Sequence, residues 1–258
     1  MLRVVSYSLF RSAASAYESE RAGAGRGVFF RGFLPTLVRA HRSVYPDWEM
    51  RIHHDERVME WEYFHALERM RDRKMLKLIF MGPVPSLCGG MLWRLNPIFD
   101  SHVSHVICRD VDSLSMPRER RAVERWIAGG KPLHSMQDST SHHATRIMGG
   151  MLGCRTDFMR KIYPQPEALQ TMMHLSGIDF DKHGADQRFL FIELDRYDRE
   201  GLLHLDTPET LGPKDDPRDV CDGFARHIGG AVHAGPIAKW YDEHHPDQNI
   251  LDCEKVQA

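Results

Sequence analysis

Two aspartates, Asp110 and Asp112, follow an apolar run at residues 103–108. If the chain bends there, both carboxylates can reach one hard cation that keeps coordination positions open for phosphate oxygens. A strand ending in this pair would place it where open α/β sheets bind their ligands. The alternative is a solvated turn in which Asp112 or Ser113 caps the next helix. The context, a strand about 100 residues into a chain that also begins with a strand, favours the cation site.

Apolar periodicity predicts alternating strands and helices around this pair. Expected strands cover residues 2–9, 48–53, 77–81, 103–108, 133–136 and 148–154, with a short one near Leu203. Expected helices cover residues 29–45, 56–70, 116–128, 157–163, 166–175 and 185–194, and a helical segment within residues 88–99 that Asn96-Pro97 breaks. Ser115 is the expected N-cap of the 116–128 helix, and Gly129-Gly130 its end. This alternation predicts an α/β architecture with a mainly parallel sheet, and no linker divides residues 1–258 into domains.

Five stretches, in this order, resemble the GT-A fold glycosyltransferases, which transfer a sugar from a nucleoside diphosphate to an acceptor. They are residues 4–7 (VVSY), 91–94 (MLWR), 110–112 (DVD), 148–152 (MGGML) and 184–190 (GADQRFL). The resemblance covers roughly residues 2–240. It implies a Rossmann-like GT-A fold with a central, mainly parallel sheet flanked by helices. It also implies a hexosyltransferase-type enzyme that uses a UDP- or GDP-sugar donor and a hydroxyl of a glycan or other acceptor.

The same resemblance implies a metal ion, Mn2+ or Mg2+, held by Asp110 and Asp112. This ion would bridge the donor diphosphate and neutralise charge on the leaving nucleotide. A third ligand is expected from the C-terminal part of the chain, where His227 and His233 are the candidates. Residues 233–240 resemble the His-Gly-Lys-Trp signature of the glycogenin-like family, with a departure in spacing. That likeness would place Lys239 on the diphosphate.

Donor contacts are also implied by the resemblance. Ser6, Tyr7 and Ser8, at the end of the first strand, would lie near the nucleotide. Asp55 would face the base or ribose, with a surface turn as the alternative. Arg94 would lie over the donor, because a guanidinium suits phosphate and sugar oxygens; a surface salt bridge is the alternative.

Further residues would line the sugar. Gly149 and Gly150 resemble a strand that allows a sugar to approach the backbone, although the asparagine of that strand is missing here. Asp138 would bind sugar hydroxyls or simply form a turn. Asp186 and Gln187 resemble both the Asp-Gln signature of retaining enzymes and the acidic segment of inverting ones, so Asp186 is a candidate general base. A helix N-cap at Asp186 is compatible with either, and stereochemistry stays open.

The composition argues against several other classes of protein. Of 258 residues, 42% are hydrophobic and 27% charged, which is typical of a globular domain, and no apolar run approaches the ~18 residues of a membrane span. A net charge of -2 disfavours a nucleic-acid binder. Five scattered cysteines indicate a reducing compartment, so a cytoplasmic location is expected. The region 26–42 is either a solvated amphipathic helix or a peripheral membrane contact. Most of the 16 histidines are expected to be ordinary packed or surface residues.

Two alternatives remain open. A metal-dependent nucleotidyltransferase or phosphohydrolase also uses paired aspartates, but residues 23–27 lack the Walker spacing, and haloacid-type phosphatases place their pair after the first strand. A sugar-nucleotide-binding module without activity is the other alternative, and the intact Asp110 and Asp112 count against it.

Overall fold

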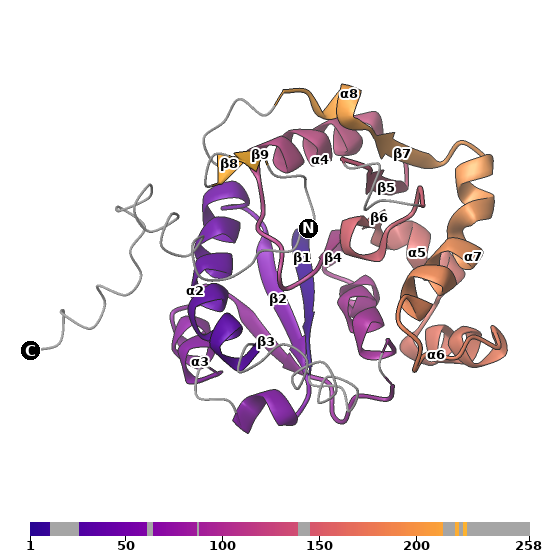
Figure 1. Cartoon of the computed structure of the whole chain (residues 1–258). Coiled ribbons are helices and arrows are strands. Elements are labelled where there is room, and N and C mark those ends of the chain that lie inside the picture. The colour runs from indigo at the N-terminus through magenta and orange to yellow at the C-terminus, as the bar shows by residue number, and fades with distance from the viewer. Residues whose placement is uncertain are drawn as a thin grey trace, which may run out of the picture.

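A seven-stranded sheet with the order β3-β2-β1-β4-β6-β5-β7 forms the centre of the computed structural model (Figure 1). The structure describes residues 1–10, 26–60, 64–86, 88–138, 145–213, 220–221 and 224–225. Side chains are described in these ranges except at residues 26–33, 60, 220–221 and 224–225.

The sheet strands are β1 (Leu2–Leu9), β2 (Glu49–His54), β3 (Lys77–Phe80), β4 (Val103–Arg109), β5 (Leu133–Met136), β6 (Gly153–Arg155) and β7 (Leu203–Asp206). β1 is parallel to β2 and β4, β2 is parallel to β3, and β5 is parallel to β7. β6 is antiparallel to both of its neighbours, β4 and β5. A separate short pair joins β8 (Val220–Cys221) and β9 (Phe224–Ala225). The predicted fold class, an α/β protein with a mainly parallel sheet, is confirmed.

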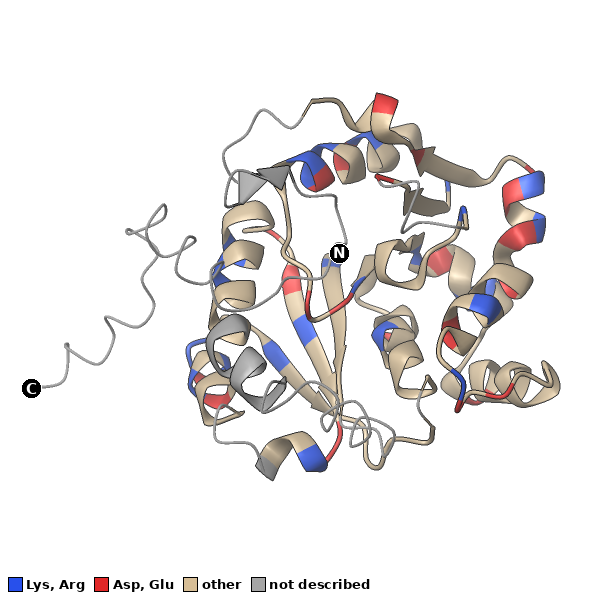
Figure 2. Cartoon of the chain, in the orientation of Figure 1, with Lys and Arg blue, Asp and Glu red and all other residues tan. Residues whose placement is uncertain are grey.

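The described α-helices are α2 (Arg26–Val44), α3 (Phe64–Asp72), α4 (Pro117–Gly129), α5 (Thr156–Ile162), α6 (Pro166–Leu175), α7 (Ala185–Arg199) and α8 (Pro208–Leu211). The described 3-10 segments are η1 (Arg57–Glu60), η2 (Gly90–Phe99) and η3 (Gly149–Met151). Figure 1 shows α2 and α3 beside β1 to β3, and α5, α6 and α7 grouped on the other side. In Figure 2, acidic and basic residues are mixed along α4 and α7, so neither helix carries the single-sign stripe of a nucleic-acid binder.

The two faces of the sheet bury two different cores. One core packs β1 and β2 against α2, α3 and α4, and the other packs β4 against η2, α5, α6 and α7. Successive residues of a strand point to opposite faces. Val5 and Ile107 therefore enter the first core, while Val4 and Val106 enter the second. Because β1 and β4 are covered on both faces, they read as continuous apolar runs.

Several expected boundaries are wrong for local reasons. The helix expected over 56–70 begins instead as the 3-10 segment η1, where Asp55 Oδ1 accepts the Val58 N–H (3.2 Å), and its described α-helical part is α3. The N-cap of α4 is Met116 rather than Ser115, although Gly130 ends the helix in the left-handed region (φ 73°) as expected. Residues 148–154 divide into η3 and β6 instead of forming one strand.

The break expected at Asn96-Pro97 is also wrong, because η2 continues through both residues. The missing Pro97 N–H removes one hydrogen bond, while the fully buried Leu95 and Ile98 hold this segment in the core. None of the helices in the described part of the chain combines the length and apolar character that a bilayer crossing requires. The single-domain organisation and the cytoplasmic location stay predictions.

Candidate functional site

A buried arginine joins two carboxylates from distant parts of the chain. Arg94, in η2, is 2% exposed. Its Nη2 donates to Asp186 Oδ2 (2.9 Å), and its Nη1 donates to Asp110 Oδ1. Burial disfavours the charged guanidinium, but the two carboxylates outweigh it and raise the pKa of Arg94 above its ordinary value. The cluster therefore combines one positively charged guanidinium with two carboxylates.

The elements at the carboxyl end of β4 position these three side chains. Asp110 directly follows β4, and a turn begins there, because the Ser113 N–H donates to the Asp110 carbonyl (3.1 Å). Asp186 lies in the first turn of α7, where the helix dipole stabilises a carboxylate. The expected N-cap at Asp186 is wrong, because Gly184 occupies that position with φ 78°. The carboxyl end of β4 thus meets the N-terminus of α7 at the Arg94 side chain.

Gly149 and Gly150 allow the backbone to pass close to this cluster. A Cβ at Gly150 would overlap the Asp110 carboxylate. A Cβ at Gly149 would lie 2.6 Å from Arg94 Nη2, and buried Arg94 has little room to move. Both positions therefore need glycine for steric reasons, and the two residues lie against Asp110 and Arg94 as a small-residue wall.

Gln187 holds that wall in place. Its Oε1 accepts the Gly149 N–H (2.7 Å), and its Nε2 donates to Thr145 Oγ1 (3.1 Å) and to the Ile147 carbonyl. The Gly149 N–H is therefore bonded to a side chain instead of a neighbouring strand, which explains why η3 replaces the expected strand. Both ends of the Gln187 amide are engaged in positioning the segment before β6.

The residues at Asp110 fit a hard divalent cation. Arg94 uses Oδ1, while Oδ2 has no hydrogen bond from the described residues, and the Asp110 side chain is 35% exposed. Asp112, two residues on, is half-buried and adds a second carboxylate to the same turn. An all-oxygen donor set at a partly exposed position suits Mg2+ or Mn2+.

Arg109 lies behind the glycine wall, where its Nη1 donates to the Gly150 carbonyl (3.4 Å), and its other contacts lie away from Asp110. Its Nε donates to Glu119 Oε1 (2.8 Å), the oxygen that also accepts the Tyr45 hydroxyl (2.7 Å). Its Nη1 donates to the Cys108 carbonyl (2.7 Å). Arg109 and Glu119 are almost completely buried, so this cluster is closed to solvent.

Four residues predicted to contact the nucleotide lie at the ends of β1 and β2. Ser8 Oγ donates to the Met91 carbonyl (3.3 Å), which places Ser8 beside η2. Ser6 lies 3.3 Å from His53 Nδ1 inside the protein, and burial raises the pKa of the Tyr7 hydroxyl above its ordinary value. The Ser6, Tyr7 and Asp55 side chains are fully buried, so the structure does not expose them to a ligand. Their contact with a nucleotide stays a prediction.

Of the remaining predicted residues, the structure describes only Asp138, which has its own partner on α4. Asp138 follows β5, is buried, and accepts a hydrogen bond from Arg118 Nη2 on α4. Its binding to sugar hydroxyls stays a prediction. His227, His233 and Lys239 lie outside the described residues.

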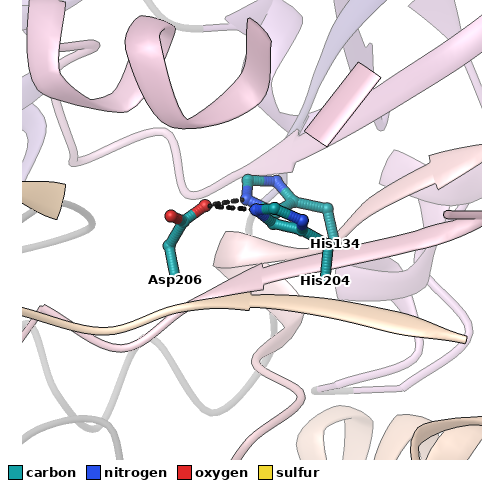
Figure 3. Close-up of side chains that lie close together, drawn as sticks. All are labelled: His134, His204 and Asp206. Carbon is teal, nitrogen blue, oxygen red and sulfur yellow. Dashed lines mark hydrogen bonds and ion pairs between the residues drawn. The ribbon is translucent and has the colours of Figure 1, made fainter. Parts of the chain in front are cut away.

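A second polar cluster was not anticipated from the sequence. Figure 3 shows His134, His204 and Asp206 directed toward one another from β5 and β7. Burial lowers the pKa of His134 to about 4, despite the nearby Asp206 carboxylate, so its imidazole is neutral. The sequence signal was the alternation of His204 and Asp206 along an expected strand, which places both on one face.

No described protein family and no curated protein matches the chain. Solved structures with similar architecture include Staphylococcus aureus TarS 1-349, with a TM-score of 0.46, 10% identity, and coverage of 75% of this chain and 55% of that one. A 4-diphosphocytidyl-2C-methyl-D-erythritol synthase from Anaerococcus prevotii has a TM-score of 0.49 at 7% identity, with 95% and 96% coverage. The mannosyltransferase PcManGT from Pyrobaculum calidifontis, solved with GDP-Man and Mn2+, has a TM-score of 0.45 at 12% identity, with 100% and 65% coverage.

The chain thus spans 55% of TarS 1-349. Nucleotide-sugar glycosyltransferases, the class that the sequence resembles, are represented among these structures by the mannosyltransferase.

Proposed function

We propose that the chain is a metal-dependent glycosyltransferase that moves a sugar from a nucleoside diphosphate sugar to a hydroxyl of a glycan or other acceptor. The observation that carries the proposal is the Arg94–Asp110–Asp186 cluster at the carboxyl end of β4, walled by Gly149 and Gly150. Open α/β sheets bind their ligands at this end of the strands. A cluster with fixed positive charge, partly exposed carboxylate and close backbone suits a ligand that is both anionic and rich in hydroxyls.

Each group has a distinct task in this proposal. Asp110 Oδ2 and the Asp112 carboxylate would hold Mn2+ or Mg2+. The ion would neutralise the negative charge on the leaving diphosphate. Arg94 keeps its positive charge because two carboxylates stabilise it, and it fixes the Asp110 carboxylate by holding Oδ1. Gly149 and Gly150 allow the backbone to line the sugar without side chains intervening.

Asp186 is the candidate for the acceptor hydroxyl. As a carboxylate it can accept that proton, which is the role of a general base in an inverting reaction. In a retaining reaction with front-side attack, the leaving phosphate takes the proton and Asp186 orients Arg94 through the 2.9 Å bond to Nη2. Gln187 acts in either scheme by holding Gly149 against the site. Ser8, whose hydroxyl donates to the Met91 carbonyl of η2, is the proposed contact of β1 with the nucleotide.

Thermal unfolding with UDP, GDP, CDP and dTDP, each with and without Mn2+ or Mg2+, tests the binding part of this proposal. A diphosphate present at 100 times its Kd adds about 2.7 kcal/mol to the free energy of unfolding. We expect one nucleotide to stabilise the protein only when metal is present, and the effect to vanish in Asp110→Asn. Asp72→Asn on the exposed end of α3 is the matched control and should keep the full effect. No stabilisation by any diphosphate in the folded protein would contradict the proposal.

A product assay separates the glycosyltransferase from the alternatives. The glycosyltransferase releases a nucleoside diphosphate from the sugar donor, and the release accelerates when an acceptor hydroxyl is supplied. A nucleotidyltransferase releases pyrophosphate from a nucleoside triphosphate and a sugar phosphate. If the protein binds the diphosphate and the metal but releases neither product, it is a binding module without activity.

A further inference from the structure

His134, His204 and Asp206 come from two neighbouring parallel strands. In the β5–β7 ladder His134 is paired with His204, and Met136 is paired with Asp206. Residues two apart along a strand point to the same face, so the paired strands carry all three side chains on one side of the sheet. The ligand atoms that they offer lie within 4.8 Å of one another. This proximity depends on the backbone ladder rather than on flexible loops.

The nitrogens of both histidines are directed at one oxygen. His134 Nε2 lies 2.9 Å and His204 Nε2 lies 3.3 Å from Asp206 Oδ2. Dashed lines in Figure 3 mark both contacts. The other oxygen, Oδ1, accepts hydrogen bonds from Arg125 Nη2 (2.8 Å) and Thr210 Oγ1 (3.0 Å). Outer contacts of this kind orient the carboxylate in metal sites. The carboxylate is therefore fixed with Oδ2 toward the imidazoles.

The environment keeps His134 available as a ligand. Its ring stacks on Trp126 of α4, with centroids 5.2 Å apart and planes at 9°. The ring is fully buried, so this stacking fixes its orientation toward Asp206. The His204 side chain is 27% exposed, so this side of the cluster is open to solvent. The guanidinium of Arg125, 42% exposed, neutralises part of the Asp206 charge from the far oxygen, where water screens it.

We propose that His134, His204 and Asp206 form a transition-metal site, with Zn2+ as its preferred ion, separate from the Asp110 site. Two imidazole nitrogens and one carboxylate oxygen are a donor set that zinc takes in proteins, with a fourth position left to water or a ligand. Mg2+ and Ca2+ prefer all-oxygen sites, so the ion that suits this cluster differs from the one that suits Asp110 and Asp112. A bound ion would join β5 to β7 and, through Thr210, to α8.

The decisive experiment is a Zn2+ titration of the chelator-treated full-length protein by calorimetry, followed by Co2+ in place of Zn2+ to record its visible ligand-field band. We expect one Zn2+ per chain. In His204→Ala, whose ring is partly exposed, the affinity should fall at least about 100-fold, the upper end of losses seen when even outer partners of a metal are removed. The Co2+ band should disappear in the same variant.

The matched control is His174→Ala, which removes an exposed histidine on α6. It should leave Zn2+ affinity and the Co2+ band unchanged, as should Asp110→Asn. His134→Gln provides a second ligand deletion, and near-ultraviolet circular dichroism checks that each variant is folded. Equal Zn2+ affinity in His204→Ala and the unchanged protein would overturn the proposal, as would no Zn2+ binding by the folded protein. The cluster would then be a hydrogen-bonded pair of histidines that supports the β5–β7 ladder.

Discussion

Two arginine–carboxylate clusters lie on opposite faces of β4, and they differ in their access to solvent. Arg109 and Asp110 are consecutive, yet Arg109 bonds to Glu119 and Tyr45 in one core, while Asp110 bonds to Arg94 on the other face. The Arg109 and Glu119 side chains are 1% and 0% exposed, whereas the Asp110 side chain is 35% exposed. The first cluster is closed and joins β4 to α4 and to Tyr45, the residue directly after α2. The second has an open carboxylate, so a ligand can reach it.

The comparison also shows what burial demands of a charged group. Within the described residues, Arg109 Nη2 and Glu119 Oε2 have no hydrogen-bond partner, so even the closed cluster is not fully satisfied. The intact cluster therefore adds little to the free energy of unfolding. Removing one partner would lower that free energy much more, because it leaves a buried charge without its counter-charge. The open cluster can lose one carboxylate at lower cost, since Arg94 has two.

The largest effect is expected from Glu119→Ala. This change leaves the Arg109 guanidinium buried without a carboxylate and removes the acceptor of the Tyr45 hydroxyl. The free energy of unfolding should fall by about 3–5 kcal/mol, measured by urea denaturation. A loss below about 1 kcal/mol would mean that the closed cluster is not the structural element that its burial indicates.

Gly150→Ala tests the steric wall of the open cluster. The new methyl group would overlap the Asp110 carboxylate, so either the carboxylate or the backbone must move, at a cost of about 1–3 kcal/mol. The metal-dependent stabilisation by a nucleoside diphosphate should be lost as well. Gly129→Ala is the control, because its methyl group would lie 3.9 Å from the nearest atom, His204 Nδ1, and should not destabilise the protein.

Tyr45→Phe tests how much the Tyr45 hydroxyl contributes to the stability of the closed cluster. It removes a hydroxyl that donates to Glu119 Oε1 but leaves the Arg109–Glu119 pair intact. We expect a loss of about 0.5–1.5 kcal/mol in the free energy of unfolding and no change in nucleotide binding. A change in nucleotide affinity would show that the two faces of β4 are coupled.

Asp110→Asn should have the smallest effect on stability. An asparagine keeps an oxygen for Arg94 Nη1, and Asp186 still neutralises the guanidinium, so the free energy of unfolding should change by less than about 1 kcal/mol at this partly exposed position. Metal-dependent nucleotide binding and sugar transfer should nevertheless be abolished. Retention of both activities would exclude Asp110 as a metal ligand.

Local sequence predicted the parts of the site that depend on one segment. The apolar run before Asp110 predicted β4 and the turn after it, and residues 184–187 predicted the start of α7. The bond between Arg94 and Asp186 could not be predicted, because it joins positions 92 residues apart through the packing of η2 and α7. The clamp of Gln187 on Gly149 has the same origin.

The His134 cluster shows a second reason why sequence reasoning fell short. Its three residues meet only because β5 pairs with β7 in one particular register. Periodicity predicted strands at both places but carried no information about which strands are neighbours. It also gave no reason to place the short antiparallel β6 between β4 and β5.

That placement of β6 has a consequence for the order in which the sheet is completed. The β1–β4 ladder joins residues such as Val4 and Val106, about 100 positions apart, whereas β6 pairs with β4 and β5 over 50 positions or fewer. The three residues of β6 therefore connect β4 to β5 after shorter loop closures, and Gly153 passes close to His134 and Trp126. Because contacts between distant residues form slowly, we expect the pairing of β1 with β4, and not that of β6, to limit the refolding rate. A substitution at Gly153 would then accelerate unfolding more than it slows folding.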